Sequence, residues 1–301
     1  MRSFPFVDAH VHLWDLDHIS YSWLKPPFGS GPNGDVSPIA KTYLLDDYLA
    51  DAAEWDVRGI VHVDAGADAK DARRETEWLQ VMADKRGMPN AIVAFAALND
   101  PDVEPLLAFH AGHRNVRGIR HIVNWHADPA KTYGPTDMTL DPQWAKGYAL
   151  LGKYNLSFDL QAYPGQFAHL ASIIAPHPGI PVIINHAGMP VDTDEAGKAL
   201  WIDGMTKLAA LPHVSVKLSG FGFIHRDWIL DQIKTYLLKV IDIFGTKRCL
   251  FASDFPTDKL FGSFNKHLDA YATITSDFSE DERRDLFARN AIRAYRMKIE
   301  L

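Results

Sequence analysis

Short runs of apolar residues recur along the whole chain, and most of them are continuous instead of alternating with polar residues. Their content of Val, Ile, Leu, Phe and Ala favours β-strands, and strands that are apolar on both faces are typical of a parallel sheet covered by helices. We therefore predict eight buried strands, at residues 4–10, 59–65, 91–97, 116–123, 156–162, 181–187, 214–219 and 249–254.

The segments between these runs carry apolar residues at helical spacing. Residues 44–55 and 227–244 place Leu, Ile, Tyr, Trp or Phe every three to four positions, which predicts amphipathic helices. Ser279 and Glu282 have the spacing of a capping box, so a further helix is expected to begin there.

The alternation of eight strands with helices predicts a (β/α)8 TIM barrel, formed by a single domain over residues 1–301. A doubly wound open sheet is the main alternative. That fold usually carries a glycine-rich phosphate loop after a strand, and neither G-x-G-x-x-G nor G-x-x-x-x-G-K-[ST] occurs in the sequence. The barrel is therefore the preferred prediction.

A long loop follows the first predicted strand. Residues 17–41 are rich in Pro, Gly and Ser, and long loops in compact domains are often lids or binding loops. The segment also contains Tyr21, Trp23 and Phe28. We therefore predict a lid that packs on substrate, with Trp23 as a contact.

Charge and composition exclude several classes of protein. The 301 residues carry a formal net charge of −7, whereas binding to nucleic acid requires a basic face. No apolar stretch approaches the roughly 18 residues that span a bilayer, so no membrane partner is expected. The single cysteine, Cys249, rules out an intramolecular disulfide and fits a reducing, cytoplasmic location. These properties are compatible with a homo-oligomer.

Polar side chains lie at the ends of most predicted strands. In (β/α)8 barrels the active site lies at the carboxyl ends of the strands, so these groups are expected to face one another or a ligand. Asp8, His10 and His12 alternate along the first strand and are expected to share one face. The polar residues at the ends of later strands are Arg120, His121, Asp159, Gln161, Asn185, His186, Lys217, Ser219 and Asp254.

Four of these residues form a candidate ligand set. His10, His12, His186 and Asp254 offer the nitrogen and oxygen atoms that bind Zn²⁺ or a similar divalent ion. A His-x-His pair alone is weak evidence for a metal. Together with a histidine and an aspartate at other strand ends, it predicts an active site, with or without an ion.

Structural roles stay open for several of the other residues. Arg120 and Lys217 either bind the substrate or pair with Asp159 inside the barrel. His121 either contacts substrate or is a hydrogen-bonded core histidine. Four further histidines fall in predicted helices or loops and are expected at the surface: His110, His113, His177 and His267.

Five motifs, in order, resemble the amidohydrolase superfamily: "VDAHVHLWD", "IRHIVNW", "VIINHAG", "VSVKLSG" and "FASDFP". More narrowly, they resemble its amidohydrolase-2 branch, which includes fuconolactonases, rhamnonolactonases and dicarboxylate lactonases. The resemblance extends to "RNAIRAYR" near the C-terminus. It implies a (β/α)8 fold and hydrolysis of a lactone by water, with Asp254 as the general base.

The same resemblance implies roles for the other site residues. His10, His12 and His186 would hold either a divalent metal or the lactone carbonyl and its water. Binuclear members use a carboxylated lysine or a glutamate on strand 4 or 5 and a histidine on strand 5, but this chain has "GIRHIVNW" and "FDLQAY" there. At most one ion, such as Zn²⁺, is therefore expected, and activity without any metal stays open. The residues predicted to bind a small sugar-acid lactone are Arg120, His121, Lys217, Gln161 and Trp23.

Two other functions compete with the lactonase. A metal-dependent decarboxylase of an aromatic or dienoic acid resembles another branch of the superfamily, but it usually needs the missing strand-5 histidine. A non-catalytic barrel that binds a sugar acid would have no use for a buried base such as Asp254.

Overall fold

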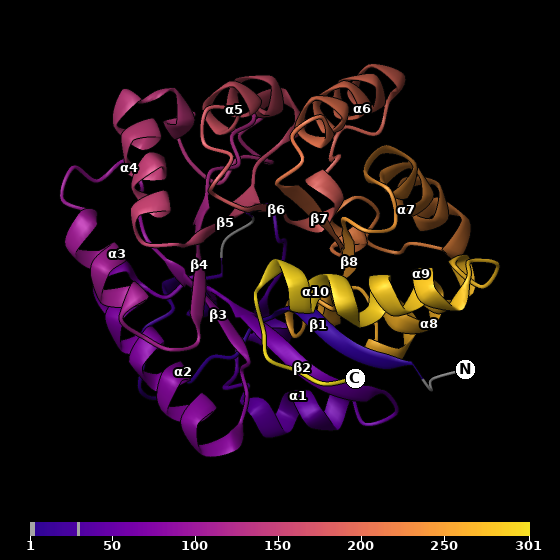
Figure 1. Cartoon of the computed structure of the whole chain (residues 1–301), viewed down its shortest axis with the longest axis horizontal. Helices are drawn as coiled ribbons and strands as arrows, with labels where there is room; N and C mark the ends of the chain where they lie inside the picture. The colour runs from indigo at the N-terminus through magenta and orange to yellow at the C-terminus, as the bar shows by residue number, and fades with distance from the viewer. Residues whose placement is uncertain (1–3, 29–30) are drawn as a thin grey trace.

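The computed structural model describes residues 4–28 and 31–301. Its eight parallel strands pair in the order β1 to β8, which confirms the predicted (β/α)8 barrel (Figure 1). The strands are β1 (Pro5–Val11), β2 (Asp56–Val63), β3 (Ala91–Phe95), β4 (Val116–Ile122), β5 (Ser157–Gln161), β6 (Val182–Ile184), β7 (Val214–Leu218) and β8 (Cys249–Phe251).

Helices surround the strands. They are α1 (Leu45–Asp51), α2 (Ala72–Arg86), α3 (Glu104–Ala111), α4 (Pro142–Lys153), α5 (Phe167–Ile174), α6 (Glu195–Ala209), α7 (Leu230–Phe244), α8 (Phe264–Ile274), α9 (Glu280–Arg284) and α10 (Asn290–Ala294). The predicted helices at 44–55 and 227–244 correspond to α1 and α7, each with narrower bounds. The capping box is confirmed, because Ser279 Oγ accepts a hydrogen bond from the Glu282 amide at the start of α9.

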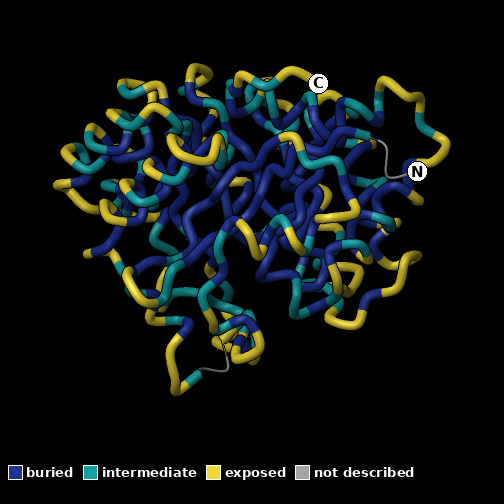
Figure 2. Tube along the Cα trace, turned by 90° about the horizontal axis from the view of Figure 1, so that it is seen from below, coloured by how far each residue is buried: buried dark blue, intermediate teal, exposed yellow. Residues whose placement is uncertain are grey.

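The barrel closes between β1 and the segment that follows β8. The His12 amide donates to the Phe255 carbonyl over 2.8 Å, and the Asp254 amide donates to the His10 carbonyl over 2.9 Å. These two backbone bonds bring the His-x-His pair and Asp254 together. α10 lies against β1 and β8 (Figure 1), and the buried part of the trace runs through the centre of the molecule (Figure 2).

The structure also places the single cysteine and shows the character of the helices. Cys249 lies buried in β8. Within residues 4–28 and 31–301, no helix combines the length and the apolar character needed to cross a membrane.

Candidate active site

A cavity of about 540 Å³ lies at the carboxyl ends of the strands. Its lining includes Arg120 of β4 and Gln161 of β5, together with His12, His186 and Asp254. Trp23 and Asn33, from the predicted lid, also line it. Positions 29 and 30 of that lid lie outside the described residues. The rule that selects strand ends therefore points to the edge of the barrel where this cavity lies.

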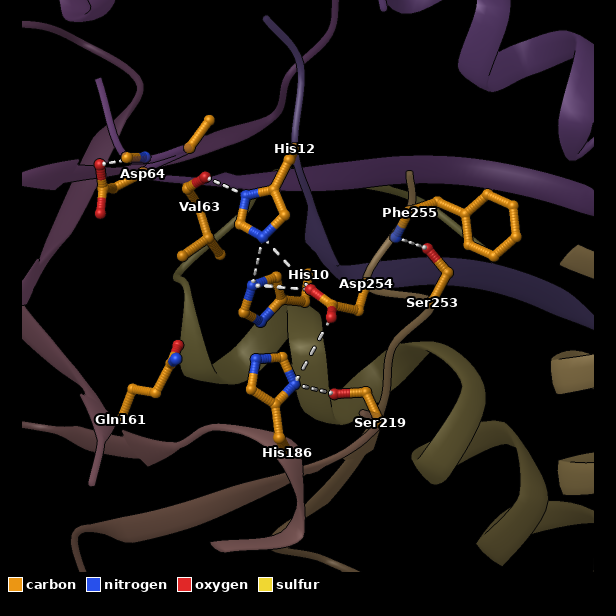
Figure 3. Close-up of polar contacts among 12 residues, drawn as sticks. His10, His12, Val63, Asp64, Gln161, His186, Ser219, Ser253, Asp254 and Phe255 are labelled. Carbon is orange, nitrogen blue, oxygen red and sulfur yellow. Dashed lines mark hydrogen bonds and ion pairs between the residues drawn. The ribbon is translucent and has the colours of Figure 1, made fainter. Parts of the chain in front are cut away.

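Three buried side chains converge beside this cavity (Figure 3). His10 Nε2 lies 3.1 Å from His12 Nε2 and 3.4 Å from Asp254 Oδ1, and His12 Nε2 lies 3.2 Å from the same oxygen. The three residues are nearly or fully inaccessible to solvent. Each of these two nitrogen atoms and the carboxylate oxygen can offer a lone pair. Lone pairs this close repel one another unless a proton or a metal ion lies between them.

The spacing of these three atoms fits a divalent ion. In a tetrahedral zinc site with bonds of about 2.0–2.1 Å, neighbouring ligand atoms lie about 3.3 Å apart. His10, His12 and Asp254 match this spacing, and they form a candidate ligand group among the described residues. His186 stands outside that group, because its Nδ1 lies 4.0 Å from the other oxygen of Asp254.

The first strand is irregular where the histidines begin. The pairing of β1 with β2 shifts register between Asp8 and Val11, so side chains do not simply alternate here. The Asp8 carboxyl accepts hydrogen bonds from Tyr48 of α1 and from the Ser253 amide, each over 2.9 Å. The prediction that Asp8 shares a face with the histidines is therefore wrong. Burial raises the pKa of Asp8 to about 6.

Backbone strain is concentrated at two site residues. His186 and Asp254 have φ values of 53° and 57°, a left-handed conformation that costs residues other than glycine of order 1–3 kcal/mol. Gly220 lies against the imidazole of His186, where an added Cβ would come within 2.7 Å of the ring. His186 Nδ1 also contacts Ser219 Oγ at 3.1 Å. These contacts hold the ring toward the cavity.

The site favours a carboxylate beside neutral imidazoles. Burial lowers the pKa of His186 to about 4 and that of His10 well below its usual range. Burial alone would raise the pKa of Asp254, but the electrostatic effects of His186, His12 and the Arg120 guanidinium together hold that pKa below 3.8. Asp254 is therefore ionised at neutral pH and can accept a proton.

Arg120 reaches the cavity with its charge already balanced. Its Nη1 donates to Gln161 Oε1 over 2.8 Å, its Nε lies 3.3 Å from Asp64 Oδ2, and its Nη2 donates to the Asp64 carbonyl. The alternative pairing of Arg120 with Asp159 is wrong, although the two residues are neighbours in the β4–β5 register. Asp159 forms its ion pair with Lys217 instead, at 2.5 Å.

Two predicted substrate contacts do not line the cavity. Lys217 is fully buried with Asp159, so the prediction that it binds substrate is wrong and the alternative pairing with Asp159 is confirmed. His121 is buried and accepts a hydrogen bond from the Leu98 amide over 3.2 Å, which fits the core-histidine alternative. Burial lowers the pKa of His121 to about 4.

The surface prediction for four histidines is wrong for two of them. His110 and His267 are fully buried. His110 bridges the Thr76 hydroxyl and the Phe95 carbonyl, and His267 Nε2 contacts the Asp258 carbonyl. His113 and His177 are half-buried.

Sequence reasoning missed Asp64 and Tyr133. Asp64 directly follows β2, and this position after an apolar run was a usable signal. Tyr133 lies in the long segment after β4, lines the cavity and donates to Asn33 Oδ1 over 2.6 Å. Nothing local in the sequence distinguishes Tyr133.

Glu75 of α2 lies behind Arg120 and Asp64. It is buried and accepts a hydrogen bond from Tyr21 of the loop over 2.9 Å. Burial and the Asp64 carboxylate raise the pKa of Glu75 from 4.5 to about 8. The folded state therefore binds this proton more tightly than the unfolded chain, so its contribution to stability is full below pH 4.5 and disappears as pH rises through 8.

We expect Glu75→Gln to flatten this pH dependence. Between pH 5 and pH 8 the wild type should lose on the order of 2 kcal/mol of unfolding free energy relative to the variant. Chemical denaturation at both pH values measures the difference. The control is Glu77→Gln, at an exposed position of α2. If the unfolding free energies of the wild type and Glu75→Gln change equally with pH, Glu75 does not cause the pH dependence.

Comparison with known proteins identifies the family. A sequence model described as amidohydrolase matches residues 7–297. The chain belongs to this family. The uncharacterized protein y4mH of Sinorhizobium fredii is 40% identical to this amidohydrolase over 298 residues, which cover 99% of this chain and 100% of y4mH.

Two other relatives carry chemical information. An L-fucono-1,5-lactonase of Burkholderia multivorans is 27% identical over 310 residues, covering 96% of this chain and 95% of the lactonase. The crystal structure of a B. multivorans amidohydrolase with bound zinc is 26% identical, covers 98% of this chain and 100% of its own, and superposes with a TM-score of 0.80. The family and these relatives indicate an enzyme.

Proposed function

We propose that this amidohydrolase hydrolyses the ester of an uncharged, hydroxylated lactone. The observation that carries the proposal is Asp254, an ionised carboxylate beside His12 and His186 at the wall of the cavity. Ionised carboxylates held in this way serve as general bases. The lactonase relatives support the same reaction class.

In this mechanism Asp254 takes a proton from water while the water oxygen bonds to the lactone carbonyl carbon. The imidazoles of His12 and His186, which line the cavity, orient the carbonyl oxygen and the water. The ring C–O bond then breaks, and the ring oxygen takes the proton from Asp254 to become a hydroxyl group. The product is a hydroxy acid, which releases a proton at neutral pH.

A divalent ion, if bound, would be held by His10, His12 and Asp254. It would supply Lewis-acid polarisation of the carbonyl.

The charges of the cavity favour a substrate without a carboxylate. Arg120 is the one lysine or arginine among the described lining residues, and Asp64 already balances it. Asp254 adds a negative charge. A carboxylated lactone would therefore meet no unpaired cation, whereas hydroxyl groups can bind the side chains of Gln161, Tyr133 and Asn33.

A pair of lactones tests this proposal. We expect kcat/KM for a neutral aldono-lactone, such as L-fucono-1,5-lactone, to exceed that for a carboxylated glucaro-lactone at least about tenfold. The double variant Asp64→Asn/Glu75→Gln removes both carboxyl groups behind Arg120. It should reduce the ratio of kcat/KM for the neutral lactone to kcat/KM for the carboxylated lactone. Preference of the wild type for the carboxylated lactone would refute the charge argument. Release of CO₂ from 2,6-dihydroxybenzoate without lactone turnover would favour the decarboxylase.

A further inference from the structure

A chain of buried polar groups runs beneath the cavity and ends at His10. Tyr295, which follows α10, donates from its hydroxyl to Asp159 Oδ1 over 2.8 Å. Lys217 Nζ donates to the same oxygen over 2.5 Å. Lys217 Nζ also lies 3.4 Å from Nδ1 of His10. All four side chains are fully buried, and the reaction as described above uses only His10.

The chemistry of Lys217 determines the direction of its contact with His10. Lys217 Nζ forms a fully buried ion pair with the Asp159 carboxylate over 2.5 Å, and this contact holds the amine in its ammonium form. An ammonium group has three hydrogens to donate and no lone pair. In the contact with Lys217, Nδ1 of His10 is therefore the acceptor. A neutral imidazole that accepts at Nδ1 carries its hydrogen on Nε2.

His12 has the opposite arrangement. Its Nδ1 lies 2.8 Å from the Val63 carbonyl, which can only accept, so Nδ1 carries the hydrogen. The Nε2 atom of neutral His12 then presents a lone pair toward Nε2 of His10, 3.1 Å away. A hydrogen on His10 Nε2 satisfies this contact and also faces Asp254 Oδ1.

We propose that Lys217 is a positioning residue that holds the hydrogen of His10 on Nε2 and thereby weakens zinc binding at the site. His10 then donates a hydrogen bond within the triangle instead of ligating an ion. The inference concerns the site of the proposed function, but its tests measure tautomer and metal affinity, so they can fail independently of lactone turnover.

The effect on zinc follows from the lone pairs. A ring nitrogen that carries a hydrogen has no lone pair for a metal, so zinc can bind His10 Nε2 only after the hydrogen leaves that atom. If the hydrogen moves to Nδ1, it faces the Lys217 ammonium, and two donors then oppose each other. In the wild type, zinc binding must therefore offset the free-energy cost of this contact between two donors.

The tautomer is measured directly by ¹⁵N NMR of histidine-labelled, metal-free protein, with the His10 signals assigned from a His10→Gln variant. We expect a protonated Nε2 and an unprotonated Nδ1 for His10, and the reverse for His12. A protonated Nδ1 on His10 would overturn the proposal. This measurement needs no variant of Lys217, so it holds even if such variants do not fold.

Zinc affinity provides the second test. We expect the double variant Lys217→Met/Asp159→Asn to bind zinc at least about tenfold more tightly than the wild type in a competition titration with a chelating dye. The two substitutions remove one charge of each sign, so the net charge near the site is unchanged, and the amide oxygen introduced by Asp159→Asn can still accept a hydrogen bond from Tyr295. The control is Lys207→Met, at an exposed position of α6, which should bind zinc like the wild type. Equal or weaker binding by the folded double variant would contradict the proposal.

Discussion

Asp254→Asn is expected to lower kcat for lactone hydrolysis by about 10³-fold or more, with the fold unchanged. The substitution keeps the size of the side chain and removes the proton acceptor, and general bases typically contribute about 10²–10⁴-fold. Asp254 is the carboxylate that lines the cavity with His12 and His186. Steady-state kinetics and thermal denaturation of the purified variant measure the two effects.

The matched control is Asp203→Asn, on the exposed side of α6, which should retain wild-type kinetics. A correctly folded Asp254→Asn enzyme with near-wild-type kcat would remove Asp254 from the role of base.

The double variant His10→Ala/His12→Ala is expected to lose about 10²-fold or more in kcat, because both rings contact the Asp254 carboxylate and misplacing a catalytic group by about 1 Å can cost that much. The wild type is expected to keep its activity after treatment with a chelator, since Lys217 favours the hydrogen-bonding form of His10 over the ligating form. The kinetics of both chelator-treated enzymes, with and without added Zn²⁺, separate the contribution of the histidine pair from that of a bound metal ion.

His113→Ala, at a half-buried histidine after α3, is the control and should behave like the wild type. Full activity of the double variant would contradict any role of the pair. Loss of wild-type activity on chelation, with recovery on adding Zn²⁺, would show that the metal is required.

The barrel and the position of its site were predictable because both depend on local patterns. Apolar runs predicted the strands, and the carboxyl-end rule brought His10, His12, His186 and Asp254 to one edge of the sheet. Backbone bonds between β1 and the segment after β8 then determine how closely the His-x-His pair meets Asp254. These backbone bonds form because the barrel closes between its first and last strands.

The depth and partners of charged residues were not predictable. Arg120 and Lys217 both occupy inward positions near strand ends, but Arg120 lines the cavity and Lys217 lies beneath it. Arg120 reaches past β3 to Asp64 instead of pairing with Asp159, its neighbour in register. Such choices depend on three-dimensional distances between elements far apart in sequence.

Local backbone irregularity caused another error. The register shift in β1 separates Asp8 from the histidine face, and no residue type in "FPFVDAHVHLWD" indicates that shift. His110 and His267 were assigned to the surface because histidines in helices are often exposed, but each has a hydrogen-bonding partner in the packed interior.

The most direct test of the account is a single turnover of a neutral lactone in H₂¹⁸O with enzyme in excess. If Asp254 activates water for attack on the carbonyl carbon, one ¹⁸O atom will appear in the carboxylate of the product and none in the protein. Mass spectrometry of the product and of the peptide that contains Asp254 measures both. Unlabelled acid together with ¹⁸O in that peptide would show that Asp254 attacks the carbonyl itself, and would contradict the general-base account.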